Sequence, residues 1–322
     1  MSFLSILFSR RNTCYYYTKI IRKIVKYIKT ITYFFYMSNV KIFQGGNDGF
    51  GHQLEGTIRL LSLSVNKKAD YQYKFKKNYS FEHSNINIES LTNFINEALS
   101  IVEKNTQSSN DDISNYNFLY NEYRTFDDIM TYDDNYQNNL YFFDGVGCGR
   151  RLPNNFEHDE ELEKSLPNIR EAFVNNKYLP NPSYNNNNNN SIINICCHIR
   201  LGDAVGQRPL DNENIYNVVR YFQNRNDKYY ITIHSDGDIS HLAHKNTCLK
   251  EKTTDVLQVL SDFIHADILI INYSSLSIAA HLLAENKQIV IRPDNVGVTF
   301  MDRVLKKCIS CTNMDLIYKI SY

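Results

Sequence analysis

Charged and polar side chains gather directly after an apolar segment near residue 200. Residues 192–197 are mostly apolar, which predicts a short strand buried on both faces of a parallel sheet. His198, Arg200, Gly202 and Asp203 follow within six positions. An arginine at the end of such a strand offers donors suited to phosphate oxygens, and Gly202 lets the backbone turn sharply. This pattern predicts either an anion-binding site or a surface turn in which Arg200 pairs with Asp203.

Polar clusters also follow two later predicted strands. Residues 229–233 lead into His234, Ser235, Asp236, Gly237 and Asp238, and residues 268–271 lead into Asn272, Ser274, Ser275 and Ser277 at the start of a predicted helix. The carboxyl ends of parallel strands share one edge of a sheet, so we expect these clusters to converge with Arg200. Arginine, hydroxyls and helix amides together suit the diphosphate of a nucleotide, whose growing charge Arg200 would stabilise on departure. Plain helix capping by the serines is the alternative.

A glycine-rich turn joins a predicted strand and helix near the N-terminal end. Residues 39–43 predict the strand, and residues 44–52 form the turn. A helix follows, with Leu54, Ile58, Leu61 and Val65 at helical spacing. Such a unit can cradle a phosphate or a sugar at the helix N-terminus, although it matches neither the dinucleotide-binding fingerprint nor the P-loop.

The order of predicted elements indicates two α/β domains. Strands and helices alternate after residue 191, which predicts a doubly wound parallel sheet. Six consecutive asparagines at 185–190 follow a proline-containing stretch and predict a linker over 181–190. We therefore expect domains at 37–180 and 191–322. Residues 105–140 show no steady period and are expected to be loops or exposed helices.

The first 36 residues differ in charge from the rest. They hold seven basic residues and no acidic ones. The remaining residues, 37–322, therefore include 28 basic and 35 acidic ones, which gives them a negative net charge. An acidic body argues against nucleic-acid binding. Residues 20–35 predict a basic amphipathic helix that can contact an anionic membrane surface, and charges interrupt every window long enough to span one. The alternative is that residues 1–36 are a gene-model artefact or a processed leader.

The seven cysteines are odd in number and do not form the pattern of a disulfide framework. Cys308 and Cys311 have the spacing of half a zinc site, but the sequence offers no second pair or nearby histidines. We expect reduced, buried thiols and therefore a reducing compartment, the cytoplasm.

Four segments, in order, resemble the motifs of the α-1,2/α-1,6/protein O-fucosyltransferase superfamily, most closely the α-1,2-fucosyltransferases. The first resembles its Gly-Gly-x-Gly-Asn-Gln turn, the second its His-x-Arg-Arg-Gly-Asp segment, the third its Ser-Asp-Asp segment and the fourth its Asn-Ser-Ser-Phe-Ser segment. In this chain they are Gly45 to Gln53, His198 to Asp203, His234 to Asp236, and 267–282. Leu201 replaces the second arginine, Leu276 replaces the aromatic residue, and His52 replaces an asparagine.

The resemblance implies a GT-B-like fold, in which two Rossmann-like domains face a cleft. The 37–180 domain would lie on the acceptor side, and the 191–322 domain would bind the nucleotide sugar. The implied reaction is a metal-independent, inverting transfer of fucose from GDP-fucose to a glycan or protein hydroxyl, with no cofactor. Arg200 would bind the GDP phosphates and His198 would support its loop. Asp236 and Ser275 would contact the nucleotide, and further substrate contacts are expected from Gly45, Gly46, Gly51, His52, Gln53, Asn272, Ser274 and Ser277.

An inverting transfer usually needs a carboxylate that accepts the proton of the acceptor hydroxyl. Asp203 and Asp211 lie on the loop after the first strand of the C-terminal domain, and Glu55 could face that loop from the N-terminal domain. All three stay candidates.

Two other functions stay open. Asp236 and Asp238 match the Asp-x-Asp pattern of metal-dependent GT-A glycosyltransferases, where paired carboxylates hold Mn²⁺ or Mg²⁺ against the diphosphate. Activity that persists in EDTA would exclude this function. The second is a non-catalytic nucleotide-sugar-binding relative, which Leu201 motivates because it removes a positive charge.

Overall fold

A computed structural model describes most of the chain in separate segments. These are residues 41–46, 49–67, 70–75, 88–102, 117–120, 139–144, 156–184, 192–201, 212–225, 228–250, 254–272, 274–285, 287–293 and 308–320. The expected amphipathic helix at 20–35 and the asparagine run at 185–190 lie outside them. No helix in these segments is long and apolar enough to cross a membrane.

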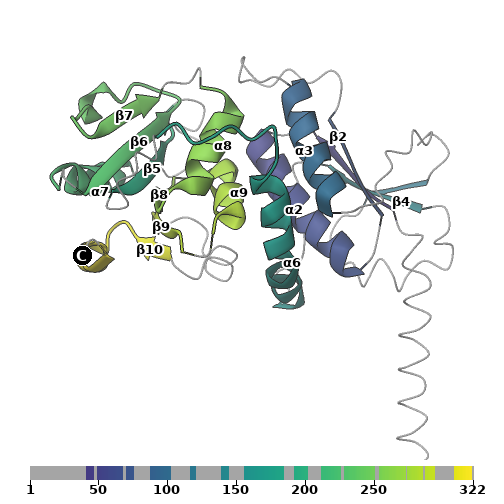
Figure 1. The fold of residues 1–322 in the computed structure, drawn as a ribbon. Helices are drawn as coiled ribbons and strands as arrows, with labels where there is room; N and C mark the ends of the chain where they lie inside the picture. Colours follow the sequence, from purple (N-terminus) through teal and green to yellow (C-terminus); the bar gives the residue numbers. More distant parts are fainter. Residues whose placement is uncertain are drawn as a thin grey trace, which may run out of the picture.

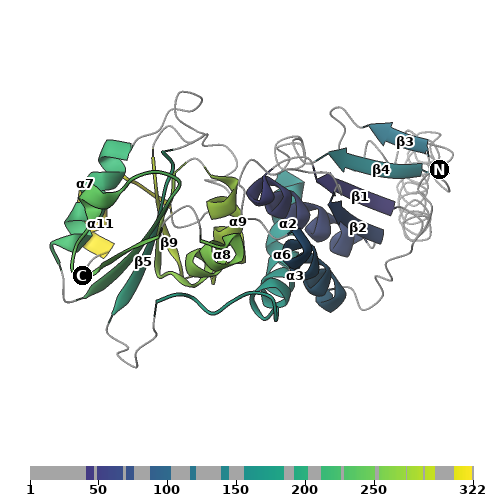
Figure 2. The ribbon, with the colours of Figure 1, turned by 90° about the horizontal axis from the view of Figure 1, so that it is seen from above.

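The N-terminal part of the chain lies on the right in Figure 1. It forms a parallel sheet in the order β2-β1-β4-β3, whose four strands are labelled in Figure 2. Its strands are β1 (Lys41–Gly46), β2 (Asp70–Phe75), β3 (Asn117–Tyr120) and β4 (Asn139–Asp144). The expectation of loops or helices across 105–140 is wrong at 117–120 and at the start of β4. These segments are only four and six residues long, so they are too short to show a clear period.

The described segments of this part include the helices α2 (Phe50–Lys67), α3 (Ile88–Val102) and α6 (Phe156–Val174). The predicted apolar face of α2 is confirmed, because Leu54, Ile58 and Leu61 are fully buried. Ser62 of α2 and Ser165 of α6 share a buried hydrogen bond of 2.5 Å.

The C-terminal part is a parallel sheet in the order β10-β9-β8-β5-β6-β7, which confirms the predicted doubly wound sheet. Its strands are β5 (Ile193–Ile199), β6 (Tyr229–Ser235), β7 (Thr247–Lys250), β8 (Ile268–Ile270), β9 (Ile289–Arg292) and β10 (Cys308–Ser310). One face packs on α7 (Asn212–Gln223) and α11 (Met314–Ile320), and the other packs on α8 (Val256–His265) and α9 (Ser275–Leu283). A short 3-10 helix, η4 (Ser240–Leu242), lies between β6 and β7.

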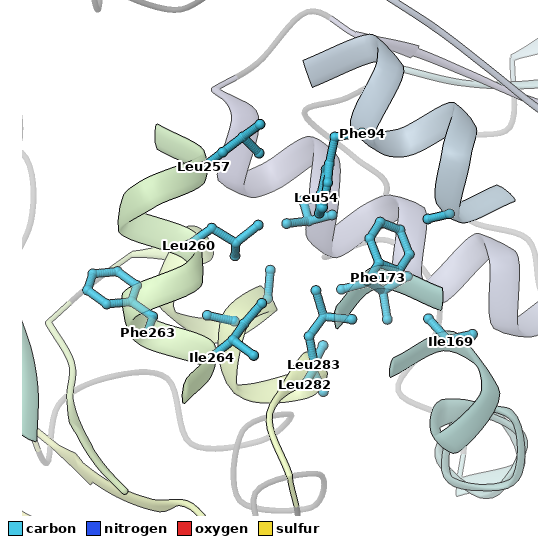
Figure 3. Packing of buried hydrophobic residues seen from close by; sticks show 14 of the residues in the cluster. Leu54, Phe94, Ile169, Phe173, Leu257, Leu260, Phe263, Ile264, Leu282 and Leu283 are labelled. Atoms are coloured by element: carbon cyan, nitrogen blue, oxygen red, sulfur yellow. The ribbon is translucent and has the colours of Figure 1, made fainter. Parts of the chain in front are cut away.

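The two sheets are separated by their helices, which pack directly against one another (Figure 2). A continuous apolar cluster crosses this boundary, from Leu54, Phe94 and Phe173 to Leu260 and Leu283 (Figure 3). In addition, Arg170 Nε of α6 donates to the carbonyl oxygen of Leu282 in α9 at 2.7 Å. The fold is therefore the predicted GT-B-like pairing of two Rossmann-like units, with an extensive apolar contact between them.

The segment just before the asparagine run is anchored on α8. The backbone N–H and hydroxyl of Ser183 donate to the two carboxylate oxygens of Asp262 at 2.6 and 2.7 Å. The Tyr184 hydroxyl donates to the Asp262 carbonyl at 3.2 Å, and its ring is buried. The first residues of the expected 181–190 linker thus pack on the C-terminal domain.

Candidate nucleotide site

The order in which the chain adds strands to the C-terminal sheet reverses between β5 and β8. From β5 the chain first builds β6 and β7 on one side, then returns to build β8, β9 and β10 on the other. In doubly wound sheets the loops after the two central strands diverge at this point, and the crevice at their carboxyl ends is where ligands bind. The segments after β5 and β8 are those that carry Arg200 and Ser274 to Ser277.

His198 and Ser277 join these two segments. His198 Nδ1 lies 2.9 Å from the Ser277 hydroxyl, which is fully buried in the first turn of α9. The His198 ring also packs against Phe263 of α8, with ring centroids 5.3 Å apart. The end of β5 is therefore fixed to the start of α9.

Arg200 is the first residue after β5, and it is half-buried. Its neighbours Ile199 and Leu201 both pack in the apolar cluster on the α7 face. Successive side chains of an extended segment point to opposite faces, so Arg200 lies on the same face as His198, toward α9. Gly202 and Asp203, which come next, lie outside the described segments.

The end of β6 contacts the same loop. The backbone N–H of Leu201 donates to Asp236 Oδ1 at 2.6 Å. Asp238 instead accepts the backbone N–H of Ser240 at 2.9 Å, and this local hydrogen bond lowers the pKa of its exposed carboxyl. No group of three or more His, Cys, Asp or Glu residues that could hold a metal ion occurs in the segments the structure describes.

The polar residues after β8 have different surroundings. Asn272 is buried, and its Nδ2 donates to Oδ1 of Asn212, the first residue of α7, at 2.7 Å. Ser274 stands at the N-cap of α9 but makes no side-chain capping hydrogen bond. Capping therefore does not account for this buried serine, while Ser275 beside it is half-buried.

The N-terminal glycine segment reaches the start of α9. Gly45 and Gly46 are the last residues of β1 and not part of a loop, whereas Asn47 and Asp48 lie outside the described segments. Gly51, in the first turn of α2, packs against the Leu276 backbone so closely that a Cβ on Gly51 would lie 2.4 Å from Leu276 N. The N-terminal ends of α2 and α9 therefore meet beside the crevice.

The neighbours of Gly51 differ in exposure. His52 is half-buried and Gln53 is fully buried. Their backbone N–H groups donate to the Gly49 carbonyl at 3.0 and 3.2 Å, which closes the first turn of α2. Of these two side chains, that of His52 is the one partly exposed to solvent.

Glu55 is held by an ion pair within α2. Its Oε1 lies 2.6 Å from Arg59 Nη2, and both side chains are less than one-tenth exposed. A carboxylate that is buried and ion-paired with an arginine is not presented to a substrate hydroxyl. Asp203 and Asp211, the other candidates for the base, lie outside the described segments.

The sequence did not reveal a buried histidine–carboxylate pair behind the crevice. His234 Nε2, two residues before Asp236, lies 2.9 Å from Asp262 Oδ2, and both side chains are buried. The signal that could have found it is Asp262 itself, a charged residue among the apolar residues 256–264. This pair fixes the end of β6 against α8 and the 180–184 segment.

No protein-family model matches this chain, and no curated protein matches it. Solved structures with a similar fold include S. aureus MnaA with UDP, at a TM-score of 0.41 and 12% identity over 87% of each chain. They also include the E. coli heptosyltransferase WaaC with ADP, at a TM-score of 0.41 and 8% identity over 87% of this chain and 97% of the other. At such identity these likenesses concern the fold alone.

Proposed function

We propose that this protein is a glycosyltransferase that binds a nucleotide sugar in the crevice between the ends of β5 and β8. The observation that carries the proposal is the hydrogen bond between His198 and Ser277. It places the Arg200 segment beside the start of α9, between the two strands where the strand order of the sheet reverses. Separate contacts attach the end of β6 and the start of α2 to the same place.

The chemistry of this cluster suits a diphosphate leaving group. A guanidinium can donate two parallel hydrogen bonds to phosphate oxygens, and the first turn of a helix adds backbone N–H groups and a favourable dipole. As the glycosidic bond to the diphosphate breaks, negative charge grows on its oxygens. Arg200 and the α9 start would stabilise that charge more strongly in the transition state than in the ground state.

The finer assignment rests on the four-motif resemblance: inverting transfer of fucose from GDP-fucose to a glycan or glycoprotein hydroxyl. Asp203 and Asp211 stay the candidates for the base, since Glu55 is occupied by Arg59. Leu201, which stands at the second arginine position, packs in the apolar cluster on the α7 face. Leu201 therefore contributes no charge here, Arg200 is the residue proposed to bind the diphosphate, and no metal ion is proposed.

A turnover assay tests this assignment. The full chain is incubated with GDP-, UDP- and ADP-sugars and mixed glycan acceptors, with and without EDTA, and release of the nucleotide is measured. We expect preference for GDP-fucose, no effect of EDTA, and a loss in kcat/KM of about 100-fold or more in R200A.

The matched control is R220A, which removes an exposed arginine of α7 whose Nη1 lies 3.8 Å from Glu213. It should behave like the wild type. Equal turnover by R200A and R220A, or a preference for a UDP-sugar that disappears in EDTA, would overturn the proposal.

A further inference from the structure

We infer that Asp236 is a positioning residue that holds the Arg200 backbone in place, and that it does not bind the nucleotide directly. This inference rests on the proposed function, because it assigns how Arg200 is held for the diphosphate. It replaces the nucleotide contact that the motif resemblance implies for Asp236.

The first observation is the hydrogen bond between the two loops. Asp236 Oδ1 accepts the backbone N–H of Leu201 at 2.6 Å, across 35 residues of sequence. Leu201 directly follows Arg200, so its amide belongs to the peptide unit that leaves the arginine Cα. A charge-assisted bond to this N–H restrains the backbone on which the guanidinium is carried.

The second observation is an independent contact between the same two loops. A Cβ on Gly237 would lie 2.5 Å from Leu201 Cβ and 3.3 Å from its Cδ1. Leu201 therefore packs directly over the Gly237 backbone, and only a residue without a side chain fits there. The amide of Leu201 is held by residue 236 and its side chain rests on residue 237.

These contacts leave Arg200 between two anchored neighbours. Ile199 is fully buried on the other side, at the end of β5. With both flanking residues fixed, the backbone of Arg200 keeps its place before a ligand arrives, which removes the backbone share of the entropic cost of binding. A carboxylate also repels a diphosphate at close range, so a role as backbone acceptor suits Asp236 better than a role as phosphate ligand.

The test compares binding of GDP and of guanosine, which lacks the phosphates, in variants of the full chain. We expect D236A to weaken GDP about tenfold and to leave guanosine unchanged, since the loss passes through Arg200. D236N retains an oxygen acceptor and should bind GDP nearly as the wild type does. G237A, which pushes Leu201 away, should weaken GDP as D236A does.

Two further measurements separate positioning from direct contact. In an R200A background, D236A should cause no additional loss of GDP affinity, because the two changes act on one interaction. Hydrogen exchange at the Leu201 amide should speed up in D236A and stay slow in D236N. The control D238A removes a carboxylate that bonds only locally to Ser240 in the described hydrogen bonds, and it should change neither binding nor Leu201 exchange.

Three outcomes would overturn the inference. An equal loss of guanosine and GDP affinity in D236A would make Asp236 a nucleoside ligand. Additive losses in R200A and D236A, with unchanged Leu201 exchange, would remove the link to Arg200 while leaving the proposed function intact. A wild-type chain that binds no GDP would overturn the proposed function and this inference together.

Discussion

Gly51 and Leu276 bring the two halves of the molecule into backbone contact. A Cβ on Gly51 would lie 2.4 Å from the Leu276 nitrogen and 2.8 Å from its Cα. Because the obstructing atoms are backbone atoms at the start of α9, they cannot rotate away as a flexible side chain would. This contact fixes the start of α2 beside the residues that follow β8.

The variant G51A should therefore destabilise the protein by about 1–3 kcal/mol, since a methyl group must separate two packed helices. G49A is the matched control, because a Cβ on Gly49 has no atom within 4 Å. Urea unfolding of both variants measures the difference. Equal midpoints for the two alanines would show that α2 and α9 are not packed as described.

The bond between His198 and Ser277 should appear as an energetic coupling. Removing either partner leaves a polar group in the buried junction without its hydrogen bond, which costs about 1–3 kcal/mol. In a double-mutant cycle of H198A and S277A, the unfolding free energies should deviate from additivity by at least about 0.5 kcal/mol. Strictly additive losses would mean that the two residues do not interact in solution.

Asp262 gathers donors from three segments at a fully buried carboxylate. Ser183 supplies two donors, Gln258 Nε2 one at 3.0 Å, and His234 Nε2 one at 2.9 Å. D262A leaves these donors without an acceptor, so we expect a loss of about 3–5 kcal/mol in the free energy of unfolding. D255A, which removes the N-cap hydrogen bond of α8, should cost only about 0.5–2 kcal/mol. Similar losses in both variants would contradict a central role for Asp262.

The lowered pKa of the Asp262 carboxyl leads us to expect a loss of stability in acid. Burial alone raises the pKa of Asp262, but the hydrogen bonds from His234 and Ser183 outweigh it and hold the pKa below its usual value. A depressed pKa contributes stability above the unfolded value of about 4, and this contribution disappears as the pH falls through the folded pKa. Urea unfolding of the wild type between pH 5 and pH 3 should show the decline, with a smaller slope in D262N. An identical slope in the variant would assign the decline to other groups.

We expect a second dependence of stability on pH, at milder acidity, from His281. Its Nδ1 lies 2.8 Å from Gln288 Oε1, and burial lowers the pKa of the imidazole below its usual value. Between the unfolded pKa of about 6.5 and the lower folded pKa, the unfolded chain binds more protons, so stability falls as the pH falls. H281N keeps an amide donor for Gln288 but does not titrate, and it should flatten this slope between pH 7 and pH 5.5. A slope as steep as that of the wild type would refute the assignment.

Much of the fold could be predicted because its strands are apolar and its helices are periodic. The buried strand β5 and the apolar face of α2, with Leu54, Ile58 and Leu61, carry signals that local sequence alone supplies. In contrast, β3 has four residues and α6 contains Pro167 and a largely polar sequence. In these elements tertiary packing decides the structure, so the sequence gives little indication of them.

The candidate site shows the same division. The expectation that the segments after β5, β6 and β8 would meet follows from the rules of parallel sheets, and their joining by His198–Ser277 and Leu201–Asp236 agrees with it. The close approach of Gly51 to Leu276 joins residues 225 positions apart across two domains. Periodicity and motif spacing describe one chain segment at a time, so they could not indicate that contact.

The proposed function requires Arg200 to bind the diphosphate of a nucleotide at the crevice beside β5 and β8. Titration calorimetry of GDP with the wild type, R200A and R220A tests it most directly. The wild type and R220A should bind GDP with similar affinity, and R200A should bind at least about tenfold more weakly because a charge-assisted pair to phosphate is lost. Equal affinity of R200A and the wild type for GDP would contradict the account.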